Sequence, residues 1–311
     1  MKKIVALALA LVLVMAAACA SAAEIGICQL VQHPALDAAT QGFKDALTEK
    51  LGDDVTFDEQ NASGDAVNCA TIINTFVSNS VDLILANATP ALQAAVAATA
   101  DIPVLGTSIT EYGVALGIDD FNGVTGINVS GTSDLAPLNE QAAMVKELFP
   151  EAKKVGLLYC SAEANSIYQV KVVGEELVKL GYETEEFAFT DSNDVASVTQ
   201  SAVDSCEVIY IPTDNTAAAY TDTIANVVIP ANIPVIAGEE GICAGCGVAT
   251  LTISYYDIGY KTGEMAYEIL ANGADISAMP IEYAPQFTKK YNAENVDALG
   301  IEIPEGYVAI E

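Results

Sequence analysis

The chain has 311 residues, of which 52% are hydrophobic and 17% are charged. It is too apolar for a disordered chain and long enough for two ordinary domains, so disordered and fibrous architectures are excluded. Acidic residues number 42 against 12 basic ones, all of them lysine, which gives a formal net charge of −30. A nucleic-acid binder is therefore not expected, because phosphate neutralisation requires clustered Lys and Arg.

Export is indicated by the first residues. Lys2 and Lys3 precede an unbroken apolar run over residues 4–18, which has the length of a signal peptide. We favour lipoprotein processing, with small residues ahead of a lipidated Cys19, so that residues 1–23 form a signal peptide and lipoprotein anchor. The alternative is ordinary cleavage at residues 20–22 and a protein free in the periplasm or secreted. No second apolar run approaches the roughly 20 residues that a bilayer requires, so we expect an extracytoplasmic protein, tethered to the outer face of the membrane.

Enzymatic and metal chemistry is restricted by the single histidine, His33. A single histidine excludes most catalytic sites of the Ser/His/Asp and Cys/His types and all metal sites that need several histidines. The chain also has no Gly-x-Ser-x-Gly elbow, no Walker loop and no Gly-x-Gly-x-x-Gly after a strand. An enzyme would be left with carboxylate chemistry by Asp214 together with Glu239 or Glu240. We expect no enzyme, no cofactor and no metal.

Six cysteines remain after Cys19, an even number that permits disulfides in an exported protein. Cys28 and Cys160 end apolar strand-like runs, a pattern typical of buried thiols. Cys243-x-x-Cys246 suits a small disulfide loop or half of a metal site. Zinc is not expected, because a second pair is missing and the one histidine is distant.

An internal repeat determines the predicted fold. The first set of predicted strands lies near residues 25, 81–86 and 101–107, and a second set recurs in the same order near 155–159, 208–211 and 232–238. The offset between the two sets is about 130 positions, both for the first strands and for the Ile-Pro-Val triplets. Helices are predicted over 35–51, 91–100, 135–148, 166–180, 195–203, 217–227 and 255–270. The strands are continuous apolar runs, as expected where helices cover both faces of a sheet.

The predicted fold class is therefore α/β, with two doubly wound parallel-sheet lobes joined by a multi-strand hinge. The tail beyond the second repeat predicts that the chain crosses between the lobes near 129, 253 and 281. The first lobe would comprise residues 24–129 plus 254–280, and the second residues 130–253 plus 281–311.

Two facing lobes of this kind predict a ligand cleft, because ligands of open α/β sheets bind beyond the carboxyl ends of the strands. In the first lobe the candidate binding residues are Gln32, His33, Asn87, Ala88, Thr89, Thr107, Ser108 and Thr110. In the second lobe they are Ser161, Asn165, Ser166, Thr213, Asp214, Asn215, Glu239 and Glu240. Hydroxyls and amides gather in the first lobe and carboxylates in the second, which indicates a zwitterionic ligand.

Particular roles follow from this asymmetry. The hydroxyls of Thr89 and Thr107 and helix-start amides would hold the ligand carboxylate, since the chain has no Arg. Asp214, Glu239 or Glu240 would pair with the ligand ammonium. Each residue also has a structural interpretation, as a helix cap, a solvated charge or, for His33, a loop contact. The aromatic candidates for an apolar pocket are Tyr112, Phe121, Tyr159, Tyr168, Tyr220, Tyr255 and Tyr256.

At these loops the sequence resembles the TrpX-like family of ABC-transporter substrate-binding proteins, within the type I periplasmic binding-protein fold. The resemblance is carried by residues 29–37, by 81–84 with 88–90, and by 101–104, 124–126, 165–166 and 212–215. It extends over the whole mature chain, from about residue 25 to the C-terminal tail.

The resemblance implies a two-lobed receptor that captures a small solute and delivers it to a membrane permease driven by a cytoplasmic ATPase. Several relatives look like aromatic amino-acid binders, so an aromatic amino acid is the expected ligand, with branched-chain residues next. Closure would be a hinge motion of a monomer. The alternative function is a ligand-sensing subunit that signals through a membrane partner.

Overall fold

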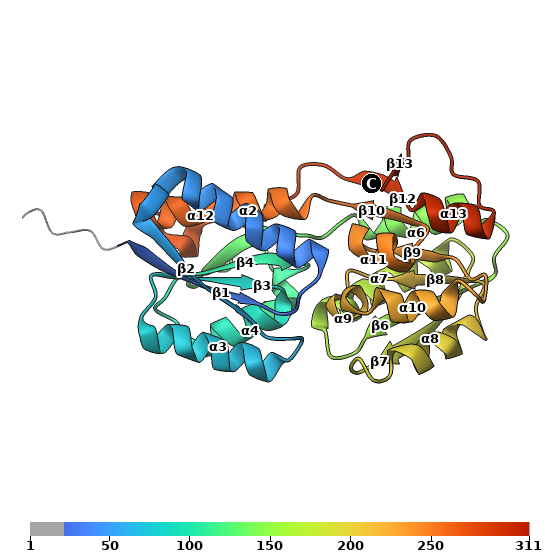
Figure 1. The fold of residues 1–311 in the computed structure, drawn as a ribbon, viewed down its shortest axis with the longest axis horizontal. Helices are drawn as coiled ribbons and strands as arrows, with labels where there is room; N and C mark the ends of the chain where they lie inside the picture. The colour runs from blue at the N-terminus through green and yellow to red at the C-terminus, as the bar shows by residue number, and fades with distance from the viewer. Residues whose placement is uncertain (1–21, 311) are drawn as a thin grey trace, which may run out of the picture.

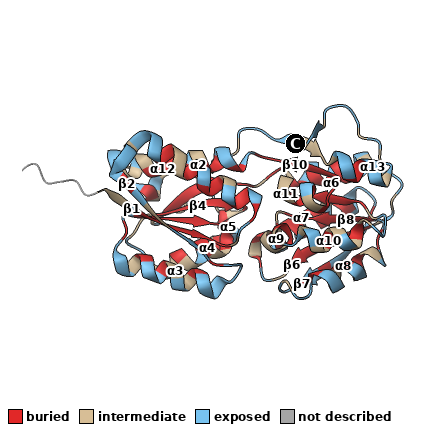
Figure 2. Cartoon of the chain, in the orientation of Figure 1, coloured by how far each residue is buried: buried red, intermediate tan, exposed pale blue. Residues whose placement is uncertain are grey.

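A computed structural model describes residues 22–310 as two lobes lying side by side (Figure 1). Each lobe is an α/β sandwich with a sheet in its centre and helices on both faces. Buried residues concentrate in the two sheets and on the inward faces of the helices (Figure 2). Each lobe therefore has its own hydrophobic core, as the repeat in the sequence predicts.

The first lobe is built on a parallel sheet in the order β11-β5-β4-β3-β1-β2. Its strands are β1 (Ala23–Gln29), β2 (Val55–Asn61), β3 (Leu83–Asn87), β4 (Val104–Ile109), β5 (Val129–Ser133) and β11 (Glu282–Tyr283). Its helices are α2 (Pro34–Leu51), α3 (Ala66–Asn79), α4 (Thr89–Ala98), α5 (Tyr112–Leu116) and α12 (Tyr255–Asn272), with 3-10 turns at Gly52–Asp54 and Ile276–Ala278.

The second lobe is built on a sheet in the order β13-β12-β10-β9-β8-β6-β7, in which β12 runs antiparallel to β10. Its strands are β6 (Lys154–Cys160), β7 (Glu183–Phe189), β8 (Val208–Ile211), β9 (Val235–Ala237), β10 (Ala249–Thr252), β12 (Thr288–Tyr291) and β13 (Val308–Ala309). Its helices are α6 (Leu138–Leu148), α7 (Ala164–Lys179), α8 (Val195–Val203), α9 (Asn215–Ala219), α10 (Thr221–Val228), α11 (Glu240–Cys246) and α13 (Ala293–Leu299).

The two sheets repeat one topology, since β2-β1-β3-β4-β5 in the first lobe corresponds to β7-β6-β8-β9-β10 in the second. This confirms the predicted fold class of two doubly wound lobes. The strands β2 and β7, which lie next to β1 and β6 at the sheet edges, were not predicted. Both are largely exposed and carry acidic residues, so neither forms the apolar run by which the inner strands were found.

The chain passes between the lobes over residues 134–137, 253–254 and 284–287. β5 and β11 both pair within the first sheet, so the chain leaves this lobe a few residues later than the crossings predicted near 129 and 281. The sequence of β5, Val-Ser-Gly-Thr-Ser, has too few apolar residues to be predicted as a buried strand. The 253 crossing lies where it was predicted, between β10 and α12.

All six cysteines in the described part of the chain are buried and carry free thiols. Cys243 and Cys246 lie on α11, where the Cys246 thiol donates to the carbonyl of Ile242 at 3.4 Å. This pair lies on a helix with both thiols free, and not in the small disulfide loop considered for it. Within residues 22–310 no group of three or more potential metal-ligating side chains is assembled.

Close packing of α2 against α12 depends on glycine. A Cβ on Gly259 of α12 would overlap the backbone carbonyl of Ala39 on α2, and one on Gly42 would overlap that of Tyr256. The same contact places Tyr255, the first residue of α12, beside Ala35 and Ala39 of α2. This helix pair therefore fixes both the first lobe and one end of the hinge.

We predict that Gly259→Ala destabilises the protein by about 1–3 kcal/mol, because the added methyl group forces two packed helices apart. The measurement is urea unfolding followed by circular dichroism. Gly174→Ala on α7 is the matched control, since its Cβ meets only the end of the Leu157 side chain at 3.1 Å. Equal stability of the two variants would contradict the packing argument.

Candidate functional site

A small cavity lies between the two lobes, at the carboxyl ends of their strands. It is narrow, with about 270 Å³ of empty space that includes its opening to solvent. The lining residues are His33, Leu36, Ser108 and Thr110 from the first lobe, Asp134 and Tyr255 at the crossings, and Asn165, Thr213, Asp214, Asn215, Ala218 and Glu239 from the second lobe. Any ligand held there contacts both lobes at once.

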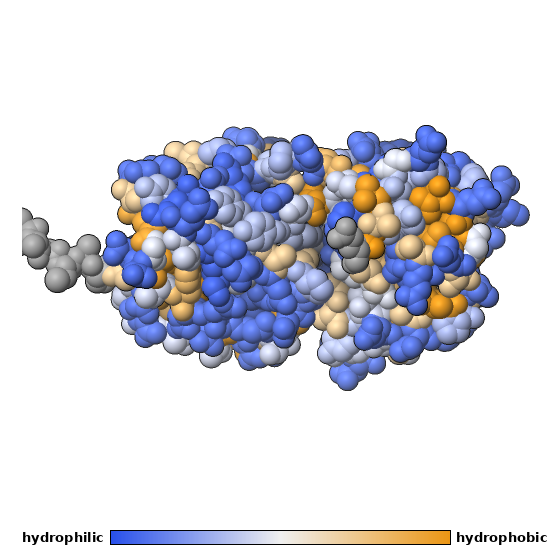
Figure 3. Space-filling view, turned by 45° about the horizontal axis from the view of Figure 1, so that its top comes forward, coloured by the Kyte–Doolittle hydropathy of each residue, from blue (hydrophilic) through white to orange (hydrophobic). Residues whose placement is uncertain are grey.

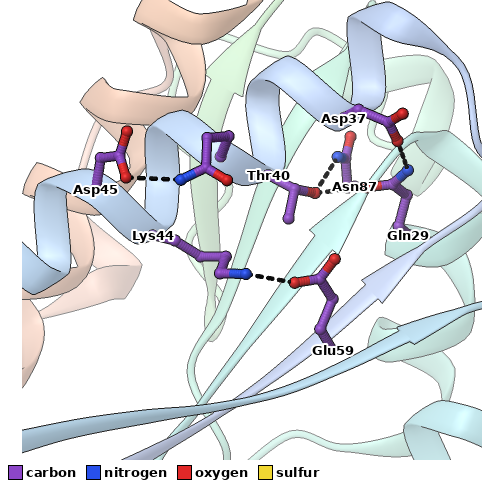
Figure 4. Close-up of polar contacts among 8 residues, drawn as sticks. Gln29, Asp37, Thr40, Lys44, Asp45, Glu59 and Asn87 are labelled. Carbon is purple, nitrogen blue, oxygen red and sulfur yellow. Dashed lines mark hydrogen bonds and ion pairs between the residues drawn. The ribbon is translucent and has the colours of Figure 1, made fainter.

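A network of hydrogen bonds lies at the start of α2 (Figure 4). The Asn87 amide donates to the Thr40 hydroxyl at 2.9 Å, and that hydroxyl donates to Gln29 at 2.6 Å. The Gln29 amide in turn donates to Asp37 at 2.6 Å. These bonds fasten the first turns of α2 to the ends of β1 and β3, and His33 immediately precedes that helix.

Ser108 is directed into the cavity by an irregularity in β4. The register between β4 and β5 shifts between Gly106 and Ile109, and Ser108 adopts a left-handed φ of 56°. Such bulges redirect side chains and are common beside functional sites. Tyr112 stabilises the bulge, because its hydroxyl donates to the carbonyl of Gly106 at 3.0 Å.

Two crossings are tied together at the cavity by Asp134 and Tyr255. Asp134 follows β5 directly, and its Oδ2 accepts a hydrogen bond from the Tyr255 hydroxyl at 2.9 Å. Both side chains are buried, with exposed fractions of 4% and 7%. Burial raises the pKa of Asp134 to about 6, although the hydrogen bond from Tyr255 opposes this shift.

The second lobe presents Asn165 and Asn215, which Glu163 holds in place. The Glu163 carboxylate accepts from the side-chain amide of Asn215 at 2.6 Å and from that of Asn165 at 3.2 Å. It also accepts from Thr216, through the backbone N–H at 2.9 Å and the hydroxyl at 2.8 Å. The Oδ1 atom of Asn215 then faces Nε2 of His33 at 3.3 Å, a contact between the lobes.

Unpaired polar atoms converge on this cavity. Six buried side-chain atoms in the described residues have no hydrogen-bond partner, and four of them belong to residues that line the cavity. The four are His33 Nδ1, Ser108 Oγ, Asp134 Oδ1 and Asn165 Oδ1. Each unpaired buried group costs about 1–3 kcal/mol, so a ligand that supplies matching partners gains that much at each atom.

Asp214 and Glu239 reach the cavity but are already engaged as helix caps. The two oxygens of Asp214 accept from the backbone N–H groups of Ala217 at 2.8 Å and Cys160 at 2.6 Å. Glu239 accepts from the N–H groups of Gly241 and Ile242 at the start of α11. Burial raises the pKa of each to about 7. Their role as ammonium partners stays a prediction, and Asp134 is the lining carboxylate with an oxygen that has no hydrogen-bond partner.

The structure gathers nine of the candidate residues around the cavity and leaves eight outside its lining. The nine are His33, Ser108, Thr110, Asn165, Thr213, Asp214, Asn215, Glu239 and Tyr255. The eight are Gln32, Asn87, Ala88, Thr89, Thr107, Ser161, Ser166 and Glu240. Cys19 lies outside the described residues.

Two of the excluded residues were expected to hold a ligand carboxylate. The Thr107 hydroxyl instead shares a buried hydrogen bond of 3.2 Å with Thr132. Thr89 is the first residue of α4, preceded by Ala88 as N-cap with φ of 91°, and it is buried. Neither residue is among those that line the cavity, so the role predicted for these two hydroxyls stays a prediction.

The other excluded residues have structural or surface roles. Asn87 belongs to the α2 network, Ser161 donates to the carbonyl of Phe189 at 3.2 Å, and the Ser166 hydroxyl accepts from the Asn165 amide at 3.3 Å. Glu240 forms an ion pair with Lys290 at 2.7 Å. Gln32 is exposed at the edge of the site.

Leu36, Asp134 and Ala218 line the cavity without having been predicted. Asp134 follows the carboxyl end of a central strand, the position that identified the other candidates. It was missed because β5 is too polar to be predicted as a strand. Among the aromatic candidates Tyr255 lines the cavity, whereas Tyr112 is buried in the first lobe and the other five also lie outside the lining.

Larger grooves flank the cavity on two sides. The hinge groove, of about 1030 Å³, contains Tyr255, Glu239 and the Lys290–Glu240 pair. The mouth groove, of about 1610 Å³, runs between the lobes along residues 30–32 and 61–66 on one side and 190–192 and Asn215 on the other. In the space-filling view the outline of the molecule narrows between the lobes (Figure 3). The cavity therefore has a hinge end and a mouth end.

Comparison with known proteins agrees with this architecture. The family model for ABC transporter substrate-binding proteins matches residues 24–310. The chain belongs to this family. It is 37% identical over 281 residues to a tyrosine-binding protein of Clostridioides difficile, covering 89% of this chain and 81% of the relative. As a family member it is an extracytoplasmic binding component of a transporter and not an enzyme. Among residues 22–310, no helix combines the length and hydrophobicity that a bilayer span requires.

Two solved structures bear on the arrangement of the lobes. An ABC domain from Streptococcus pneumoniae in complex with L-Trp is 32% identical, with a TM-score of 0.88, coverage of 93% of this chain and of the whole of that one. The ligand-free, open structure of a substrate-binding protein from Clostridium difficile is 38% identical, with coverage of 93% and 99%, but has a TM-score of only 0.70. The lobes of this chain therefore lie closer to the arrangement of the ligand-bound relative, although its sequence is closer to the open one.

Proposed function

We propose that the protein captures an aromatic amino acid between its lobes and delivers it to the permease of an ABC importer. The observation that carries this proposal is the buried carboxylate of Asp134, which directs a free oxygen into a cavity enclosed by both lobes. An ammonium group would satisfy that oxygen. The names of the tyrosine-binding and Trp-bound relatives support an aromatic side chain. Membership of a transporter family favours transport over the sensing alternative.

The ligand would be oriented by its charged groups. Its ammonium pairs with Asp134 at the hinge end, where Tyr255 holds the carboxylate in place. Its carboxylate pairs with hydroxyls from β4 and the loop after it, Ser108 and Thr110, because the chain has no arginine. Leu36, Ala218 and the Tyr255 ring supply apolar surface for the side chain. Closure is favoured because these contacts come from both lobes.

The first prediction concerns binding itself. The protein contains no tryptophan, so the fluorescence of added L-tryptophan can be followed without background. We expect a saturable blue shift on titration, and a stabilisation of about 2.7 kcal/mol when ligand exceeds its Kd a hundredfold. Thermal-shift screening of all twenty amino acids then ranks the ligands, with branched-chain residues as the next candidates. No response to any aromatic or branched-chain member would refute the proposal.

A second prediction uses the titration of Asp134, whose pKa of about 6 lies near neutral pH in the empty site. Ammonium binding requires the ionised carboxylate, so protons compete with ligand. Affinity should fall about tenfold for each pH unit below 6. Asp134→Asn should weaken binding on the order of tenfold to a hundredfold and remove this part of the pH dependence.

Calorimetric titration between pH 4.5 and 8 provides this measurement. Asp214 and Glu239 also titrate near neutral pH, so the difference between wild-type and variant profiles isolates Asp134. Glu240→Gln is the matched control, because Glu240 lies outside the cavity, and it should keep the wild-type profile. An unchanged pH profile in Asp134→Asn would assign the ammonium to another group.

We further propose that the protein acts as a monomer, since one chain forms the whole cavity, and that it is tethered through a lipidated Cys19. The signal-like run before Cys19 supports the tether. Wild-type protein expressed in its host should fractionate with membranes, and Cys19→Ala should be released. Release of both proteins in equal measure would favour ordinary cleavage at residues 20–22.

A further inference from the structure

The lone histidine lines the cavity between the two grooves. His33 is only 6% exposed, and its neighbours Gln32 and Pro34 line the mouth groove and the hinge groove respectively. Its hydrogen-bond partner Asn215 also lines the mouth groove. A ligand whose ammonium meets Asp134 therefore lies in the same cavity as His33.

The hydrogen-bonding state of the His33 ring follows from its surroundings. The Glu163 carboxylate accepts from the Asn215 amide nitrogen, so Asn215 turns its oxygen toward His33. The Nε2 atom must then carry the proton and donate to that oxygen. Burial lowers the pKa of His33, although Glu163 and Asp37 oppose the shift, so the ring is neutral at pH 7. Nδ1 is consequently an acceptor, and it is one of the buried atoms without a partner.

Acceptors dominate the unpaired atoms in the cavity. The side-chain amide of Asn165 is shared among Glu163, Ser166 and Thr213 as acceptors. Its Oδ1 atom is the second unpaired acceptor of the cavity, and it comes from the second lobe. Asp134 Oδ1 is a third. The ammonium group of the ligand would satisfy Asp134, and a donor on the ligand side chain would satisfy another of these acceptors.

We propose that His33 Nδ1 accepts a hydrogen bond from a donor on the ligand side chain, so that the site selects amino acids with a ring N–H or O–H over phenylalanine. This inference rests on the proposed function and specifies its ligand class. Tryptophan supplies an indole N–H and tyrosine a phenol O–H, whereas phenylalanine leaves Nδ1 buried and unpaired. Sites built to bond such a group reject the analogue that lacks it, since the unpaired atom costs far more than a lost contact.

The test compares ligands across variants of His33. Kd values are measured by calorimetry for tryptophan, tyrosine and phenylalanine, and for 1-methyltryptophan and O-methyltyrosine, whose ring donors are blocked. Tryptophan or tyrosine, whichever binds wild-type protein more tightly, should bind at least tenfold more tightly than phenylalanine. It should also bind at least tenfold more tightly than the methylated form of the same amino acid. His33→Leu should reduce this preference to near unity, and His33→Gln, which keeps an acceptor, should restore part of it.

Gln32→Leu is the matched control, one residue away and outside the cavity lining, and it should keep the full preference. A purely structural role for His33 predicts that His33→Leu weakens all ligands alike, which would overturn the inference. Phenylalanine binding as tightly as tryptophan and tyrosine to wild-type protein would also overturn it while leaving the proposed function intact. Absence of binding by every amino acid would instead refute the proposed function.

A second measurement does not depend on the folding of a variant. Because the chain has one histidine, the ring nitrogens of His33 give unambiguous signals in ¹⁵N-detected NMR. In the free protein we expect a neutral ring protonated at Nε2. Tryptophan or tyrosine should shift the Nδ1 resonance in the direction of an accepted hydrogen bond, and phenylalanine should not. An Nδ1-protonated ring, or equal shifts with all three ligands, would contradict the assignment.

Discussion

The carboxylate of Asp134 is the constraint around which the site is organised. It is buried where the chain leaves the first sheet, one oxygen is engaged by Tyr255 from a second crossing, and the other has no partner within the protein. A buried acceptor of this kind is costly unless a ligand or water pairs with it. One interaction therefore links the hinge to the ligand, since the same carboxylate joins two crossings and faces the cavity.

Duplication of the fold explains why the polar groups meet. Each lobe places the carboxyl ends of its central strands at one edge, and the crossings turn these edges toward each other. Within a lobe most of the polar side chains at these edges serve the fold. Asn87 and Gln29 fasten α2 to the sheet, and Asp214 and Glu239 cap helices. Four of the six buried side-chain atoms without a hydrogen-bond partner in the described residues belong to residues that line the space between the lobes.

The sequence predicted the fold class well because the inner strands are continuous apolar runs repeated at a constant offset. It predicted the site at the level of loops, since His33, Ser108 and Asn165 all follow predicted strands. It could not separate ligand contacts from caps. Thr107 and Ser108 are adjacent, yet a bulge turns one hydroxyl into the lobe and the other into the cavity. Asp134 was missed because the strand before it, rich in Ser, Thr and Gly, shows no apolar pattern.

Closure of the lobes is governed by the same unpaired atoms. Beside the cavity, the side chains of His33 and Asn215 join the two lobes at 3.3 Å. Four unpaired atoms beside it each cost about 1–3 kcal/mol when buried and empty. Opening exposes them to water and also separates two lobes of a protein whose net charge is −30. A ligand therefore favours closure to the extent that its donors pair with these atoms only when the lobes meet.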